Sequence, residues 1–102
     1  MLNILSMGWA LPKNEITNDF LHDQVGLERG LDWVNSRLGI ENRYSVLSRE
    51  YILKTRNQNP MQAILHARSH GETTVTMAAR AGTMALEKAG LRLEQIGMVL
   101  IN

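Results

Sequence analysis

The pattern of apolar side chains predicts a strand near each end of the chain, from alternation at the first and from a continuous apolar run at the second. Residues 2–9 alternate and carry apolar side chains on both sides, which predicts a first strand. Pro12 ends that strand, because proline cannot donate to a sheet ladder. Residues 97–101 form a continuous apolar run, which is typical of a strand covered on both faces.

Helical spacing follows the first predicted strand. We expect Asn18 to act as the N-cap of a short helix that ends at Gly26. A second helix is predicted from apolar residues at steps of four, three and four, which are Leu27, Leu31, Val34 and Leu38. Gly39 stands where a left-handed residue would end this helix.

The middle of the chain predicts one short extended piece, over residues 43–47, and two helices. Ser48 is expected to cap the first helix, which carries Tyr51 and Thr55. Asn59-Pro60 fits the N-cap and first turn of a helix that continues to about Ser69.

The segment 72–89 predicts the clearest helix. Its apolar face includes Gly82, which costs about 1 kcal/mol relative to alanine in a helix interior. We therefore expect close packing at Gly82, and we expect Gly90 to end the helix.

The order of strand, helices and strand predicts a parallel βαβ unit and an α/β fold. Two parallel strands make a poor independent domain, because parallel sheets need neighbouring strands and two covered faces. The pattern therefore indicates the opening part of a larger α/β protein, incomplete as a stand-alone domain.

Composition narrows the class of protein. A length of 102 residues, 44% of them hydrophobic, allows one globular domain at most. The net charge of +1 gives no electrostatic bias towards nucleic acid or a membrane surface, so neither partner is expected. The longest apolar run is far shorter than the ~20 residues of a membrane helix, and no targeting segment is visible. We expect a cytoplasmic protein.

Zero cysteine excludes a disulfide scaffold, a cysteine-ligated metal and a thiol nucleophile within this chain. His66 and His70 are four residues apart with Glu72 nearby, a spacing that could place two imidazoles on one metal. There is no clear third ligand, so we expect exposed helix polarity there and no metal site.

Several pieces of the chain, taken in order, resemble β-ketoacyl-acyl-carrier-protein synthase III. The first pieces are Gly8-Trp9-Ala10-Leu11-Pro12 and Thr17-Asn18 with Leu21. The next is similar to the Trp–Arg–Gly–Ile–Arg signature of that family and comprises Asp32-Trp33-Val34, Arg37, Gly39-Ile40 and Arg43. The last pieces are Ala78-Ala79, Ala85-Leu86, Ala89-Gly90-Leu91 and Gln95-Ile96-Gly97. The resemblance covers nearly the whole chain except about residues 48–70.

The resemblance implies a thiolase-like fold and, for the full-length protein, a cytoplasmic homodimer. It implies an acyltransferase that condenses an acyl-CoA with malonyl-acyl carrier protein, with loss of carbon dioxide, in fatty acid or related lipid synthesis. It implies no resident cofactor. The cysteine, histidine and asparagine that it implies for catalysis lie downstream of the matched pieces. We therefore expect this chain alone to be inactive and assign no catalytic residue in it.

The resemblance gives Trp33 and Arg37 a role at the substrate entrance, where they would hold the adenine and phosphates of CoA. An indole face can stack on a purine, and a guanidinium can grip phosphate in a planar fork. The alternative is a tryptophan packed in the core beside a surface arginine. The chain departs from the family at Leu38, Ser6 and Arg29, where threonine, glycine and threonine are usual.

Residues 48–70 form a segment longer than the usual link of the family, and we interpret it as an insertion. From Arg49 onward this segment has four basic residues against one acid, Glu50. Carrier proteins are generally acidic, so Arg49, Lys54 and Arg56 are candidates for docking one. The alternative is a solvated helical hairpin with no partner.

A second hypothesis belongs to another class of protein. The chain could be a non-catalytic binding or dimerisation module, or a split subunit of a thiolase-fold assembly. A reading frame that continues with a cysteine soon after the next strand would favour the enzyme, and a stop codon after Asn102 would favour the module.

Overall fold

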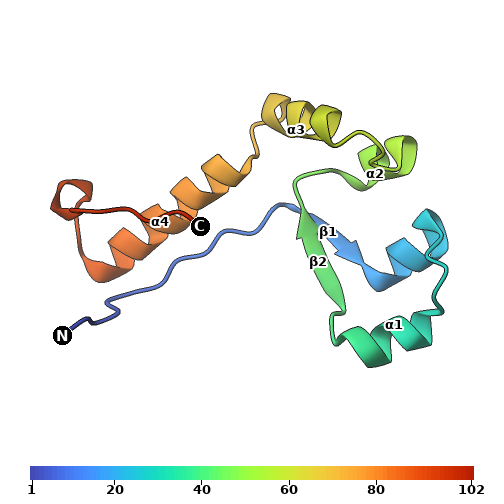
Figure 1. The fold of residues 1–102 in the computed structure, drawn as a ribbon, viewed down its shortest axis with the longest axis horizontal. Coiled ribbons are helices and arrows are strands. Elements are labelled where there is room, and N and C mark those ends of the chain that lie inside the picture. The colour runs from blue at the N-terminus through green and yellow to red at the C-terminus, as the bar shows by residue number, and fades with distance from the viewer. The chain divides into compact units, whose positions relative to one another are not determined.

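A computed structural model describes all 102 residues (Figure 1). The chain divides into two compact units. The first, which we call the α4 unit, comprises residues 1–10 and 74–102, and the second, the sheet unit, comprises residues 11–73. No helix is both long and apolar enough to cross a membrane.

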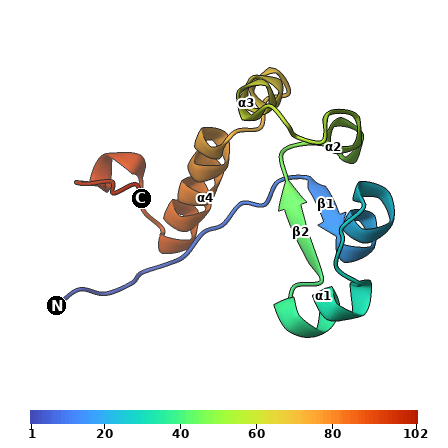
Figure 2. The same cartoon turned by 45° about the vertical axis from the view of Figure 1, so that its right-hand side comes forward.

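The sheet unit contains the only sheet, formed by β1 (Asn14–Thr17) and β2 (Asn42–Ser45). The two strands are antiparallel, with Ile16 opposite Arg43 (Figure 2). A six-residue π-helical turn (Phe20–Val25) and α1 (Leu31–Leu38) connect them. The predicted extended piece at 43–47 corresponds to β2, whereas β1 was not expected.

The core of the sheet unit is small and is supplied by nearly every element. Its buried apolar side chains come from β1, the π-helical turn, α1, the turn after β2, and α3. They are Ile16, Phe20, Val34, Leu47, Ala63 and Ala67.

Both predicted N-caps in the middle of the chain are confirmed. The Ser48 hydroxyl accepts a hydrogen bond of 3.1 Å from the Tyr51 N–H, at the start of α2 (Arg49–Thr55). The Asn59 side chain accepts one of 3.2 Å from the Gln62 N–H, at the start of α3 (Pro60–Ser69). Each cap satisfies one of the backbone donors that the first turn of a helix leaves unpaired.

The predictions for the first two helices are partly wrong. Asn18 does not cap the π-helical turn; the Thr17 hydroxyl accepts the hydrogen bond from the Phe20 N–H instead, at 3.1 Å. α1 begins at Leu31 rather than near Leu27, because Gly30 has extended backbone dihedrals and is the N-cap. Its end is as predicted, with Gly39 left-handed at φ 61°.

The α4 unit consists of α4 (Thr74–Ala89), a short 3₁₀ turn (Leu93–Gln95) and the N-terminal segment. The predicted helix end is confirmed, since Gly90 is left-handed at φ 67°. Figures 1 and 2 both show the N-terminal segment passing beside α4. The Ser6 hydroxyl donates to the Ala85 carbonyl at 2.6 Å, which fixes this crossing.

Close packing occurs at Gly8 and not at Gly82, which corrects the prediction. A Cβ on Gly8 would lie 2.0 Å from the Ala81 carbonyl oxygen and 2.8 Å from the Ala85 nitrogen, both backbone atoms of α4. A Cβ on Gly82 would meet nothing within 4 Å. Gly82 instead lines an open apolar groove of about 560 Å³ in the α4 unit.

The predicted strands at 2–9 and 97–101 are wrong as assigned, and so is the parallel pairing. Neither segment joins a sheet, and the one sheet is antiparallel. Side chains in both segments stay exposed, including Leu2 and Leu100. A strand needs a partner ladder, and no other segment of the chain pairs with either one. Helices with a small sheet remain, a mixture compatible with an α/β fold.

Candidate functional site

The two residues predicted at the substrate entrance, Trp33 and Arg37, lie on the exposed side of α1. The Trp33 side chain is 43% exposed, and Arg37 is exposed one turn later. Val34, between them in sequence, is 2% exposed and anchors the helix in the core. On α1 it is Val34, and not Trp33, that occupies the buried position.

Arg29 adds a second guanidinium to this surface. Its guanidinium carbon lies 5.0 Å from the centre of the Trp33 ring, within cation–π range. Arg29 and Arg37 thus stand four residues before and four residues after Trp33. We call these three residues the Trp33 surface. An exposed indole with guanidinium groups from the same surface offers stacking to a planar base and charge to a phosphate.

A buried amide beneath α1 holds this helix in place. The Asn18 side chain donates to Asn35 Oδ1 at 2.7 Å and to the Ile40 carbonyl at 2.6 Å. Its oxygen accepts from Arg43 Nη2 at 2.9 Å. Asn18 is 4% exposed and so joins α1, the turn that follows α1, and β2. The sequence pattern missed this role, because the partners of Asn18 are distant in sequence.

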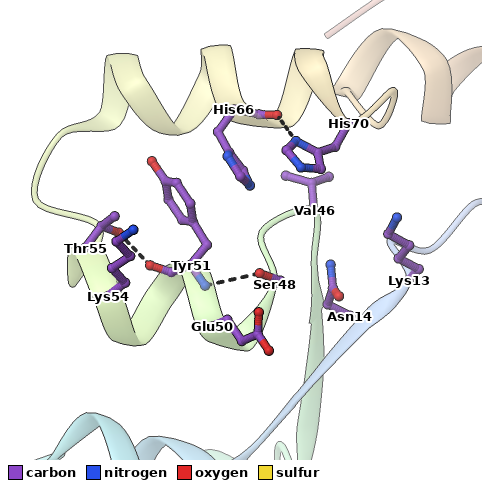
Figure 3. A pocket seen from close by; sticks show the side chains of 10 residues that line it. All are labelled: Lys13, Asn14, Val46, Ser48, Glu50, Tyr51, Lys54, Thr55, His66 and His70. Carbon is purple, nitrogen blue, oxygen red and sulfur yellow. Dashed lines mark hydrogen bonds between the residues drawn. The ribbon is translucent and has the colours of Figure 1, made fainter.

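The second candidate region is a cavity of about 460 Å³ where α2 and α3 meet the ends of the sheet (Figure 3). Three aromatic rings follow one another along it, with Tyr51 stacked on His66 and His70 tilted against His66. The rings of Tyr51 and His66 have centres 4.1 Å apart, and those of His66 and His70 have centres 4.0 Å apart. Lys13 and Lys54 lie on opposite sides of the same cavity, and Glu50 lies at its lower edge in Figure 3.

The backbone fixes the proton position on one of the two imidazoles. His70 Nδ1 lies 2.8 Å from the His66 carbonyl oxygen, which can only accept, so Nδ1 carries the proton and donates. His70 Nε2 is then the ring nitrogen with a free lone pair. The pKa of His66 is held below its usual value by desolvation and then by the neighbouring charge of His70.

No group of three or more histidine, aspartate or glutamate side chains gathers anywhere in the chain to hold a metal ion. Glu72, the nearest acid in sequence to the two histidines, is buried. Its carboxylate accepts a hydrogen bond of 3.4 Å from the Lys13 backbone N–H.

The three basic residues proposed for carrier-protein docking differ in how the fold uses them. Arg49 donates through Nε to the Glu15 carbonyl at 2.9 Å, and its guanidinium lies 5.3 Å from the centre of the Phe20 ring. Arg56 donates through Nη1 to the Val25 carbonyl at 2.8 Å. Lys54 is exposed at the cavity edge. Two of the three cations therefore also hold the sheet unit together.

Comparison with known proteins confirms the resemblance. The chain is 31% identical over 98 residues to β-ketoacyl-[acyl-carrier-protein] synthase III of Clostridium perfringens. It is 28% identical over 98 residues to the protein of the same name from Rhizorhabdus wittichii. Each match covers 96% of this chain and only 22% or 23% of the relative, so the chain spans less than a quarter of their length. No family model and no solved structure matches.

Proposed function

We propose that this chain is the N-terminal part of a thiolase-like condensing enzyme that joins an acyl-CoA to malonyl-acyl carrier protein with loss of carbon dioxide. The observation that carries the proposal is the match to two β-ketoacyl-[acyl-carrier-protein] synthases III along 96% of the chain. The exposed pair on α1 supports it, because Trp33 and Arg37 stand at the positions that the family motif gives to CoA binding.

In this proposal the Trp33 surface binds the nucleotide end of the acyl donor. The indole of Trp33 stacks on the adenine, and Arg37 pairs with a phosphate. Asn18 acts as a positioning residue, because its hydrogen bonds to Asn35 and to the Ile40 carbonyl fix the orientation of α1.

The reaction itself is assigned to residues outside this chain. A thioester condensation needs a nucleophile that accepts the acyl group and donors that stabilise the enolate. The chain has no cysteine, so the proposed thiol nucleophile belongs to the rest of the protein. The homodimer that the resemblance implies is part of the same proposal. The chain alone is expected to be inactive.

The test is steady-state kinetics of the full-length protein with the variants Trp33→Ala and Arg37→Ala. Each should raise KM for acyl-CoA by about tenfold, because each loses a stacking or charge-assisted contact, and kcat should change less. With an acyl-pantetheine donor, which lacks the nucleotide, variants and parent should behave alike. The matched control is Arg68→Ala, since Arg68 is an exposed arginine on α3.

Equal KM values for acyl-CoA in both variants and the parent would refute the entrance role. A full-length protein that binds carrier protein but turns over no thioester would instead support the non-catalytic module.

A further inference from the structure

The cavity between α2, α3 and the ends of the sheet is lined mostly by residues 48–70, the segment outside the quoted family motifs, together with Lys13, Asn14 and Val46, and it offers a separate site. Its volume of about 460 Å³ falls within the usual range for small-molecule sites. It lies entirely within the sheet unit.

Charge decides what kind of ligand this cavity fits. Its lining has two lysines, Lys13 and Lys54, and two histidines, against the single acid Glu50. A metal cation would be repelled by the lysines, whereas an anion would be attracted, and more strongly once a histidine is protonated. The side chains of Asn14 and Ser48 add neutral hydrogen-bonding groups to the lining.

Each of the two imidazoles can donate to an anion from both ring nitrogens only when it is protonated. The His66 carbonyl already takes the proton of His70 Nδ1, so a second proton on His70 must go to Nε2. The stacked His66 ring carries a lowered pKa, partly because of the neighbouring His70 charge. A negative ligand beside the pair offsets that repulsion, so binding and protonation would favour each other.

We propose that this cavity binds the phosphoryl group of a small phosphorylated metabolite beside the His66–His70 pair, in the positive field of Lys13 and Lys54 on its two sides. The cavity is larger than a phosphate ion, which leaves room for the organic part of a phosphate monoester. Glu50 opposes the anion and limits its affinity.

Three further charged side chains, Glu15, Arg49 and Glu72, lie near the proposed site without lining it. Glu15 and Arg49 line an adjoining cavity that shares Lys13 and Glu50. The Glu72 carboxylate accepts from the backbone N–H of Lys13. Glu50 is therefore the acid that lines the proposed site itself.

The test is an NMR titration of the full-length protein that follows its histidine rings, with glycerol phosphate, inorganic phosphate, sulfate and glycerol as separate probes. The signals of His66 and His70 should move with all three anions and should not move with glycerol. Glycerol phosphate should produce the shift at a lower concentration than phosphate or sulfate. The internal control is His22, which lies outside the cavity and pairs with Asp23. Sulfate keeps its charge between about pH 5 and pH 8, so its affinity should rise as the histidines gain protons.

Two variants should act in opposite directions. Lys54→Gln should weaken binding about fivefold and Glu50→Gln should tighten it by a similar factor, because each changes one charge beside the anion. Lys88→Gln is the matched lysine control, since Lys88 lies in the α4 unit.

Three results would overturn the proposal: equal shifts at His22, the same direction of change in the Lys54 and Glu50 variants, or zinc uptake by the histidines in place of phosphate. A melting temperature for each variant separates a lost site from a lost fold. Preference for inorganic phosphate over glycerol phosphate would refute the monoester as ligand.

Discussion

Arg43 donates a hydrogen bond of 2.9 Å to the buried side-chain oxygen of Asn18, and this contact connects β2 to the end of β1. The Asn18 amide nitrogen uses its two protons on Asn35 and the Ile40 carbonyl. One buried amide thus holds three separate segments of the sheet unit. The other terminal nitrogen of Arg43, Nη1, is buried without a hydrogen-bond partner. The hydrogen bond from Nη2 to Asn18 is therefore important for this buried guanidinium.

Asn18→Ala is expected to lower the free energy of unfolding by about 2–4 kcal/mol, because it removes three hydrogen bonds and leaves buried polar atoms unpaired. Urea unfolding of the full-length protein, followed by circular dichroism, measures this loss. The matched control is Asn42→Ala on the neighbouring strand, where the amide donates to the exposed Glu15 carboxylate. That change should cost less than about 1 kcal/mol. Equal losses in the two variants would contradict the role of Asn18.

Gly8 and Gly82 give a second pair of variants with opposite expectations. Gly8→Ala forces a Cβ into the backbone of α4 and should destabilise the protein by at least about 1–3 kcal/mol. Gly82→Ala meets no atom and removes a flexible residue from a helix interior, so it should stabilise by up to about 1 kcal/mol. The melting temperatures of the two variants and the parent measure these changes. A lower melting temperature for Gly82→Ala would contradict the expectation and would indicate that other residues of the full protein fill the apolar groove of the α4 unit.

The sequence could predict those features whose cause lies within a few residues. The caps at Ser48 and Asn59 and the left-handed glycine at Gly39 each depend on a turn of local backbone, and each is confirmed. Asn18 shows the limit, because it has the residue type of a cap but finds partners 17 to 25 positions away.

In the candidate site, too, features set by local helical spacing could be predicted, and contacts outside the helix could not. The spacing of Trp33 and Arg37 predicted one side of a helix, and both are on the exposed side of α1. That Arg29 would cover the Trp33 ring was not predictable, because Arg29 precedes the helix and helical spacing does not govern it. The predictions of strands at 2–9 and 97–101 were wrong for a third reason. An apolar pattern indicates a preference for a strand, but it does not show whether another strand is available to pair with it.

Docking of an acidic carrier protein is a prediction that Lys54 tests best. Lys54→Glu should weaken carrier binding several-fold in low salt, and the difference should shrink at about 0.5 M salt as charges are screened. The corresponding Arg49 and Arg56 variants also lose hydrogen bonds to the Glu15 and Val25 carbonyls, so they should lower the melting temperature as well. Titration calorimetry with the carrier protein provides the affinity. Unchanged affinity in Lys54→Glu would leave the segment 48–70 as a solvated hairpin.

Two separate causes lower the pKa of His66 from its ordinary value of 6.5. Desolvation is the larger cause and the charge of His70 the smaller. His70→Gln removes only the second, so the titration midpoint of His66 should rise but stay below that of a fully solvated histidine. NMR titration of the His66 ring without added anion measures both midpoints.

The direction of the shift also fixes how stability depends on pH. A histidine whose pKa is lowered by folding is favoured in its neutral form, so its contribution is fully present above the ordinary pKa and is lost as pH falls below it. The parent should therefore lose more stability on acidification than His66→Gln does. If His66→Gln and the parent lost stability equally below the ordinary pKa, the stacked pair would not be the origin of the pH dependence.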